Sequence, residues 1–339
     1  MHRSEITIDL GAVRRNVRRL RSVLGRSQLW AVVKADGYGH GALDVAGAAL
    51  GEGALALCVA TVAEALPLRR GFAGVRILVL GPSTERDLAQ ARDADLDLAV
   101  FEEPIPEGVR AHLKLDTGMG RWGWSELPAR PVNVVGLMSH LATADSDRDF
   151  ARAQIERFEK ATAGWPNVIR HIANSAAALR IPESHLDAAR CGVALYGMSP
   201  FGEHPAVDGL EPALRWETYL AQVRQLAVGQ STGYGRVFVA QEPTWIGLVP
   251  VGYADGFRRD MSGTRVEVDG RPCHVVGAVS MDALAVELDR EVPIGTPVTL
   301  VGHGILIEDH ARVADTLNYE LSTGINSSPT RARRVVIDA

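Results

Sequence analysis

The sequence predicts an α/β fold in two parts: an N-terminal (β/α)8 barrel of the TIM type over residues 1–208, and a C-terminal mostly-β domain over 209–339. Short, continuously apolar runs, typical of parallel strands buried on both faces, alternate with alanine-rich or amphipathic segments. Seven or eight such units in about 200 residues favour a closed barrel over an open sheet. Near residue 209 the pattern changes to short β-rich runs broken by Gly, Pro and Asp, which marks the second domain.

Seven apolar runs are the candidate barrel strands: residues 30–35, 55–61, 76–81, 96–101, 112–116, 134–140 and 168–174. Three stretches between them are candidate helices: residues 41–53, 60–71 and 149–164. In the second domain, Asp269-Gly270 is a two-residue hairpin signal. Residues 310–322 are predicted to form one helix.

Composition and charge narrow the class of protein. With 46% hydrophobic and 23% charged residues in 339, the chain is globular. With a net charge of -5, the chain has no overall positive charge to attract the phosphate backbone of nucleic acid, so we expect no nucleic-acid partner. Without a run of 18 apolar residues or a leader-like N-terminus, we expect no membrane association and a cytoplasmic location. Cys58, Cys191 and Cys273 are spaced neither as a disulfide framework nor as a metal site, so no metal is expected.

Lys34 is the first candidate for chemistry. It lies in WAVVKADGYGHG, directly after an apolar strand and before a glycine-rich turn. Partial desolvation at a strand end disfavours the ammonium and favours a nucleophilic amine, which can form a Schiff base. Taken alone, such a lysine more often extends from a strand end to water.

The string VVKADGYGHG closely resembles the lysine segment of the alanine racemase family. Six further blocks match that family in order: KLDTGMGRWG (114–123), SHLATAD (139–145), HIANSAA (171–177), ARCGVALYG (189–197), VGYADGFRR (251–259) and GAVSMD (277–282). The resemblance covers nearly the whole chain. It implies a barrel plus a β domain, pyridoxal 5'-phosphate as cofactor and an amino acid as substrate.

The resemblance also implies roles for individual residues. Lys34 and Tyr253 would be acid/base groups on opposite faces of Cα, brought together from two subunits of a head-to-tail homodimer. Arg121 and Met281 would contact the substrate. The cofactor would be held by Lys34, Tyr38, His140, Ser175, Arg190, Gly192 and Val193. Lys114, often carbamylated in the family, His171 and Asp282 would support these residues.

Two of these positions carry a physical argument. Ser175 precedes the helical run AAALR, where its side chain can cap a helix and its amide can face an anion. The resemblance places Arg190 at the pyridine nitrogen of the cofactor. Arginine stays charged and only donates hydrogen bonds, so that nitrogen would remain unprotonated and the ring would be a weaker electron sink. This suits racemisation.

The sequence departs from the family twice. Residues 101–111 contain two prolines where the family usually has a barrel helix, so we expect a loop. Many members of the family contact the cofactor phosphate with a tyrosine near the C-terminus, but no tyrosine follows Tyr319 here. Either Ser327 or Ser328 substitutes for it, or the phosphate receives one hydrogen bond fewer.

The expected activity is the interconversion of L- and D-alanine, which supplies D-alanine for peptidoglycan. A serine or broad-specificity racemase and a non-catalytic pyridoxal-phosphate-binding barrel stay open.

Overall fold

The computed structural model describes residues 2–129 and 131–339. The chain forms two compact units. One contains Val13–Phe201 and Asp208–Glu211; the other contains the chain up to Ala12, Gly202–Val207 and Pro212–Ala339. This differs from the predicted division at 208/209. Strand β1 (Glu5–Asp9) pairs with two strands of the C-terminal segment, and it therefore belongs to the β-rich unit.

The first unit is a closed barrel of eight parallel strands, as predicted. In chain order they are β2 (Gln28–Val32), β3 (Ala56–Val59), β4 (Arg76–Val79), β5 (Asp97–Val100), β6 (Arg110–Lys114), β7 (Val134–Met138), β8 (Ile169–His171) and β9 (Ala188–Cys191). The barrel closes where β9 pairs with β2. Seven strands coincide with the predicted apolar runs, and β9 is the eighth.

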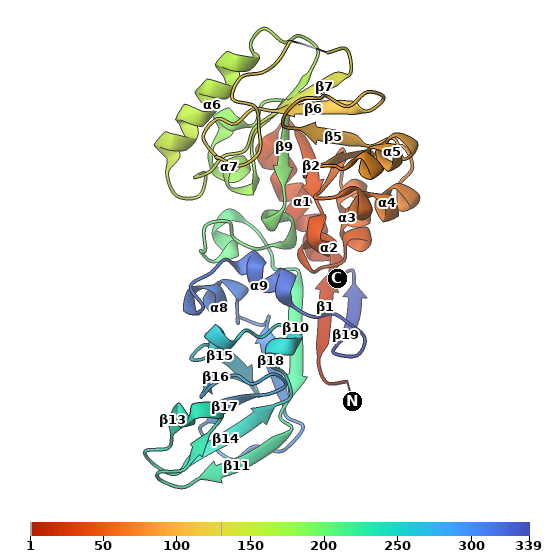
Figure 1. The fold of residues 1–339 in the computed structure, drawn as a ribbon. Helices are drawn as coiled ribbons and strands as arrows, with labels where there is room; N and C mark the ends of the chain where they lie inside the picture. The colour runs from red at the N-terminus through yellow and green to blue at the C-terminus, as the bar shows by residue number, and fades with distance from the viewer. Residues whose placement is uncertain (1, 130) are drawn as a thin grey trace. The chain divides into compact units, whose positions relative to one another are not determined.

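Helices cover the barrel on two sides. They are α1 (Leu10–Leu24), α3 (Ala42–Gly51), α4 (Val62–Gly71), α5 (Glu85–Asp93), α6 (Arg148–Thr162) and α7 (Ser175–Arg180). The predicted helices 41–53, 60–71 and 149–164 correspond to α3, α4 and α6. Figure 1 shows α3, α4 and α5 on one side of the barrel and α6 and α7 on the other. Residues 101–109, between β5 and β6, form bends and turns.

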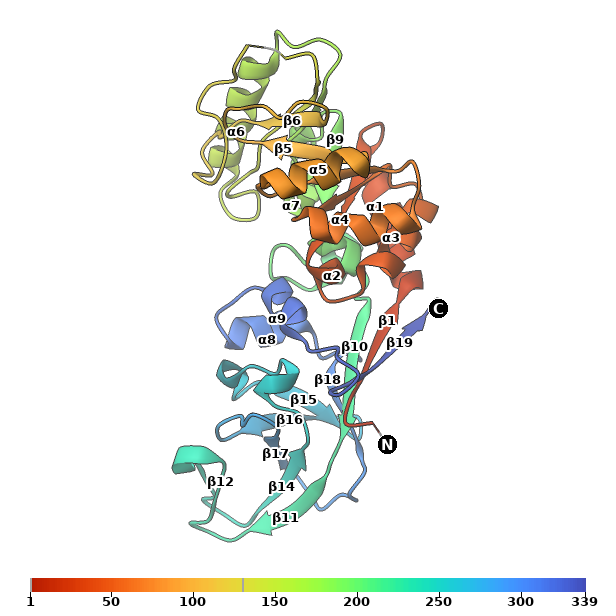
Figure 2. The same cartoon turned by 45° about the vertical axis from the view of Figure 1, so that its right-hand side comes forward.

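The second unit is built on one nine-stranded sheet in the order β11-β14-β17-β16-β15-β18-β10-β1-β19. Its remaining strands are β10 (Leu214–Tyr219), β11 (Gln222–Leu226), β14 (Thr244–Val249), β15 (Arg265–Val268), β16 (Arg271–Val276), β17 (Leu284–Leu288), β18 (Pro297–Val301) and β19 (Arg333–Ile337). A separate pair, β12 (Ser231–Thr232) and β13 (Phe238–Val239), completes the unit. Figure 2 shows β10, β1 and β19 running beside one another.

The predicted single helix over 310–322 is wrong. The structure has two helices, α8 (Ile307–Val313) and α9 (Asn318–Gly324). They are separated where Asp315 adopts a left-handed conformation with φ of 49°, which a continuous right-handed helix excludes. The predicted hairpin is confirmed, because Asp269 and Gly270 join β15 to β16 with φ of 51° and 72°.

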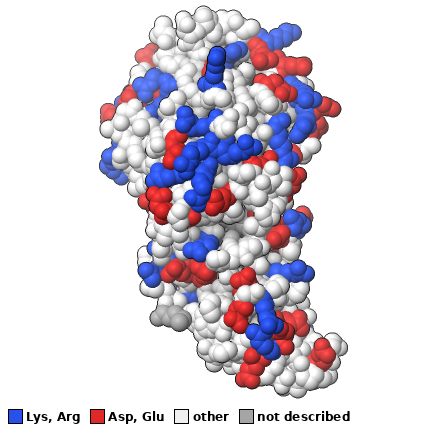
Figure 3. Space-filling model, turned by 180° about the vertical axis from the view of Figure 1, so that it is seen from behind, with Lys and Arg blue, Asp and Glu red and all other residues white. Residues whose placement is uncertain are grey.

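The surface carries charges of both signs. On the face in Figure 3, basic side chains gather in one area of the barrel unit and acidic side chains border them. Some charged side chains of the barrel unit are locally paired, since Arg15 and Arg18 of α1 contact Glu211 and Glu52. Within residues 2–129 and 131–339, no helix is both long enough and apolar enough to cross a membrane.

Gly270 tests the hairpin. A Cβ at this position would touch nothing within 4 Å, so Gly270→Ala changes only the backbone preference at a φ of +72°. We expect it to lower the free energy of unfolding by about 1 kcal/mol, measured as the shift in urea midpoint. Gly164→Ala is the matched control, since that site is equally open and lacks positive φ. Equal midpoints for the two variants would contradict the assigned turn.

Candidate active site

Lys34 stands at the carboxyl end of β2. The amide of Val33 still donates to the carbonyl of Cys58 (2.9 Å), so the strand pairing extends to the residue before the lysine. Burial lowers the pKa of the Lys34 amine, and the nearby charge of Arg121 lowers it further. A lowered pKa increases the fraction of free amine, which is the form that a nucleophile or a base needs.

The chain then makes a left-handed turn. Within α2 (Lys34–Tyr38), Ala35 has φ and ψ of 52° and 51°, Asp36 of 49° and 48°, and Gly37 of 62° and 44°. This conformation costs about 1–2 kcal/mol for each non-glycine residue. Glu64 helps to hold it: one carboxylate oxygen accepts from the amide of Ala35 (2.8 Å), and the other from that of Ala60 (2.7 Å). The turn fixes the backbone directly after Lys34.

Sequence reasoning missed Glu64 and Tyr196. Glu64 belongs to the capping box of α4 with Thr61, so the T-x-x-E spacing could have revealed it. Tyr196 is fully buried, donates to the carbonyl of Val32 (2.8 Å) and stacks on Tyr38 with a centroid distance of 4.9 Å. No local signal marks Tyr196 for this contact.

Ser175 and the start of the 3-10 helix η2 (Val193–Tyr196) form a small cluster of hydroxyls and backbone amides. The Ser175 hydroxyl accepts from the amides of Gly192 (3.0 Å) and Ala194 (3.3 Å). A Cβ on Gly192 would lie 2.5 Å from the Tyr38 hydroxyl oxygen, so only glycine fits there. In this structure both amides point at the Ser175 hydroxyl. Asn174, not Ser175, caps α7, because its side chain accepts from the amide of Ala177 (3.0 Å).

Arg190, on β9, is a buried cation with neutral partners. Its Nη1 donates to Nδ1 of His171 (2.6 Å) and to the carbonyl of His171 (2.9 Å). Its Nη2 donates to the carbonyl of Ser139 (2.7 Å) and to Nδ1 of His140 (3.3 Å). Burial lowers the pKa of Arg190 to about 10, so the guanidinium stays charged at neutral pH. Burial and the charge of Arg190 hold the pKa values of His140 and His171 well below 6.5.

Lys114 is the last residue of β6 and forms hydrogen bonds to the loop that carries Arg121. Its Nζ donates to the carbonyls of Arg121 (2.5 Å) and Trp122 (2.7 Å). The carboxylate of Asp116 accepts from three amides of the same loop. The Arg121 side chain is exposed and lies over the Trp122 ring at 5.9 Å. Burial, followed by the charges of Arg121 and Arg190, lowers the pKa of Lys114 to about 8.

The other predicted residues lie in the β-rich unit. Tyr253 opens the 3-10 helix η5 (Tyr253–Asp255), and its amide donates to the carbonyl of Ser280 (3.0 Å). The amide of Ala254 donates to the carbonyl of Met281 (3.0 Å), so the structure brings Tyr253 and Met281 together. Both side chains are exposed, to 42% and 52%.

Asp282 forms ion pairs with Arg331 (2.6 Å) and Arg3 (3.3 Å). The buried Asp255, which sequence reasoning missed, contacts the same two arginines. Ser328 shares a hydrogen bond with Thr330 (3.0 Å). The segment before it joins the Tyr253 turn, because the amide of Asn326 donates to the carbonyl of Asp255 (2.9 Å).

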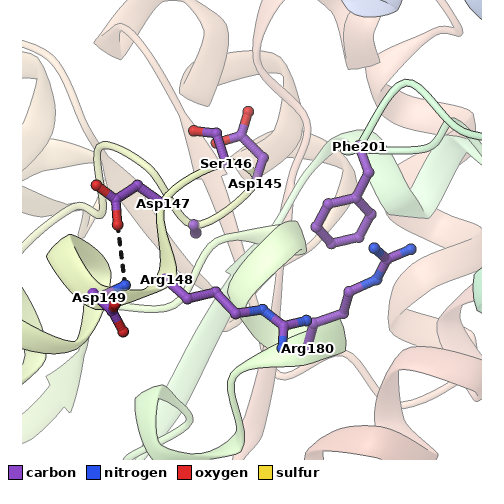
Figure 4. A pocket seen from close by; sticks show the side chains of 8 residues that line it. Asp145, Ser146, Asp147, Arg148, Asp149, Arg180 and Phe201 are labelled. Atoms are coloured by element: carbon purple, nitrogen blue, oxygen red, sulfur yellow. Dashed lines mark hydrogen bonds between the residues drawn. The ribbon is translucent and has the colours of Figure 1, made fainter.

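A hollow of about 430 Å³ lies elsewhere on the barrel unit, between the loop Asp145–Asp149 and the side chains of Arg180 and Phe201 (Figure 4). Its polar groups have structural partners. Asp147 caps α6 by accepting from the amides of Asp149 and Phe150, and Arg180 pairs with Asp208 at 2.8 Å. None of the predicted site residues lines this hollow.

Known proteins resemble this chain over nearly its whole length. The family model of the alanine racemase N-terminal domain matches residues 8–200, and that of the C-terminal domain matches residues 213–335. The alanine racemase of Lactiplantibacillus plantarum is 38% identical over 369 residues, covering 99% of this chain and 98% of that protein. Alanine racemase 1 of Bacillus subtilis is 37% identical over 354 residues, with 96% and 91% covered.

Solved structures agree with these matches. The alanine racemase of a D-cycloserine-producing Streptomyces lavendulae superposes with a TM-score of 0.92 at 35% identity, covering 100% of this chain and 98% of that one. The biosynthetic alanine racemase of Pseudomonas aeruginosa gives a TM-score of 0.91 at 36% identity, with 99% of each chain covered.

The lowered pKa of Lys114 makes stability depend on pH. Between about pH 8 and the unfolded value of 10.5 the unfolded chain binds more protons at this amine, so the free energy of unfolding rises with pH. From pH 8 to pH 10 the Lys114 contribution is about 2 kcal/mol. Urea unfolding at both pH values should show this rise in the wild type and in Lys160→Met, but not in Lys114→Met. The same pH dependence in all three proteins would refute the shift.

Proposed function

Since this chain belongs to the alanine racemase family of isomerases, we propose that it interconverts L-alanine and D-alanine with pyridoxal phosphate bound in the barrel. One observation carries the proposal. Strands β2 and β9 are neighbours: Lys34 follows β2, and Gly192, whose amide donates to the Ser175 hydroxyl of α7 (3.0 Å), follows β9. An amine with a lowered pKa, together with amides and a hydroxyl near the end of the neighbouring strand, fits an aldehyde cofactor with a phosphate group.

Pyridoxal phosphate, when bound, withdraws electrons and so acidifies the Cα proton of an amino acid. The Ser175 hydroxyl and the backbone of Gly192 and Val193 would hold its phosphate, with the Tyr38 hydroxyl alongside. Lys34 would bind its aldehyde carbon. Arg190 stays charged and can only donate, so it would leave the pyridine nitrogen unprotonated. Arg121 would orient the substrate carboxylate through its fork of donors.

Racemisation removes a proton from one face of Cα and supplies one to the other. We assign Lys34 to one face and Tyr253 of the partner subunit to the other, in a head-to-tail homodimer. The exposed side chains of Tyr253 and Met281 support this assignment, because both are accessible to a second subunit. His140 would connect Tyr253 to Arg190, since its Nδ1 accepts from Arg190 and leaves the proton on Nε2.

Alanine is the proposed substrate, and the D-alanine formed would serve peptidoglycan synthesis. The match over residues 213–335 weighs against a non-catalytic barrel, because Tyr253 and Met281 lie in that region. A serine or broad-specificity racemase stays the alternative. Chiral analysis of a panel of L-amino acids, each incubated with the purified protein and pyridoxal phosphate, separates these activities.

Tyr253→Phe removes the proposed acid/base group from one face while keeping the ring. We expect conversion of L-alanine to fall about 10²- to 10⁴-fold, while exchange of the D-alanine Cα proton with solvent partly survives at Lys34. Chiral chromatography and NMR in deuterated water measure the two rates. Tyr219→Phe, on β10, is the control and should keep full activity. Normal racemisation by Tyr253→Phe would rule out the two-base assignment.

Lys34 should be the residue that binds the cofactor covalently. The chain contains only three lysines, Lys34, Lys114 and Lys160, so the assignment is unambiguous. Borohydride reduction of the pyridoxal-phosphate-loaded protein, followed by peptide mapping, should place the label on Lys34. Lys160→Arg should be labelled as the wild type is, and Lys34→Arg should not. A label on Lys114 in the wild type would overturn the assignment.

A further inference from the structure

We propose that Asp97 is a positioning residue for Arg190, and that it acts through His112 and His171 by fixing which nitrogen of each imidazole carries the proton. The consequence for turnover rests on the proposed function. The protonation pattern of the histidines is a property of the protein alone.

The four residues, Asp97, His112, His171 and Arg190, form a continuous chain of hydrogen-bonded side chains, a polar file, through the barrel interior. Asp97 Oδ2 lies 3.0 Å from His112 Nε2, and His112 Nδ1 lies 2.9 Å from His171 Nε2. Arg190 Nη1 donates to His171 Nδ1 at 2.6 Å. All four residues are buried, with at most 4% of their surface exposed. The interior of such a barrel is usually filled by branched apolar side chains, so this file needs an explanation.

The two ends of the file determine the direction of every hydrogen bond in it. Burial raises the pKa of Asp97, but His112 and two arginines outweigh burial, so the group is an acceptor-only carboxylate. His112 must therefore carry its proton on Nε2 and, being neutral, has a bare Nδ1. That bare nitrogen requires the proton of His171 to be on Nε2. His171 Nδ1 is then free to accept from Arg190.

The surrounding structure is shaped to hold the file. A Cβ on Gly136, in the neighbouring strand β7, would lie 2.0 Å from Nδ1 of His112, so only glycine permits the imidazole there. The buried Trp30 covers both imidazoles, with centroid distances of 4.6 Å to His171 and 5.7 Å to His112. The rings are thus fixed in position, and their hydrogen-bond direction is set by Asp97.

A carboxylate is required at position 97 because both of its oxygens accept. Oδ1 accepts from Nε of Arg110 (2.6 Å), while Oδ2 lies 3.0 Å from Nε of Arg76 and 3.0 Å from Nε2 of His112. An asparagine has one oxygen and one NH2 group. If its oxygen faces Arg110, its NH2 faces His112 and selects the other tautomer. His171 would then present Nδ1–H to the Arg190 donor.

The test is the 15N spectrum of the imidazoles in the pyridoxal-phosphate-loaded protein, labelled at histidine. In the wild type we expect both His112 and His171 to be neutral with the proton on Nε2. In Asp97→Asn the two residues should move to the Nδ1–H form or exchange between forms. Asp95→Asn is the matched control: Asp95 also pairs with Arg110, but its side chain is 71% exposed and outside the file. Its histidine spectrum should equal that of the wild type.

Turnover gives an independent measure. Asp97→Asn and His112→Phe should each lower kcat about 10- to 100-fold with little change in KM, and the double variant should lose no more than either single variant. Additive losses would overturn the proposal, as would an Nδ1–H histidine in the wild type or an unchanged spectrum in Asp97→Asn. If Asp97→Asn does not fold, the wild-type spectrum decides. A protein with the predicted tautomers that does not racemise alanine would refute the proposed function and leave the positioning role intact.

Discussion

The charge of Arg190 is the constraint around which the barrel interior is organised. A guanidinium removed from water without a carboxylate partner is expensive, and arginine does not escape the cost by losing its proton. In the part of the chain that the structure describes, Arg190 forms no ion pair; carbonyls and two neutral imidazoles satisfy it instead. The interior must therefore supply oriented acceptors, which explains why histidines and a close-packed glycine occupy positions where aliphatic side chains are usual.

The candidate site concentrates positive charge in a chain whose net charge is -5. Lys34 and Lys114 both have lowered pKa values, in part because of Arg121. Such a site favours ligands with anionic groups, such as a phosphate and a carboxylate. The same repulsion lowers the pKa of both amines. In the proposed function, one arrangement of charges would serve both ligand binding and the reactivity of Lys34.

Local patterns predicted the barrel strands, three helices and the hairpin at Asp269, because each depends on residues that are near one another in sequence. β9 was not recognised as a strand, because an arginine and a cysteine interrupt its short apolar run. The left-handed turn after Lys34 contains three non-glycine residues that disfavour it, Ala35, Asp36 and Tyr38, and Glu64, from another element, holds it. Asp97 and His112 escaped notice for the same reason: their importance arises from contacts across the barrel.

Strand β1 has a consequence for how the protein is made. It lies between β10 and β19, so a strand made more than 200 residues earlier meets one neighbour at Leu214–Tyr219 and the other only at Arg333–Ile337. Pairing strands so far apart in sequence is slow compared with forming contacts between residues that are near one another in sequence. The β-rich unit is therefore completed only after Arg333–Ile337 is synthesised, whereas all eight barrel strands are available once Cys191 has emerged. A fragment cut after residue 208 would keep β1 without either neighbour, as an unpaired strand prone to associate with other chains.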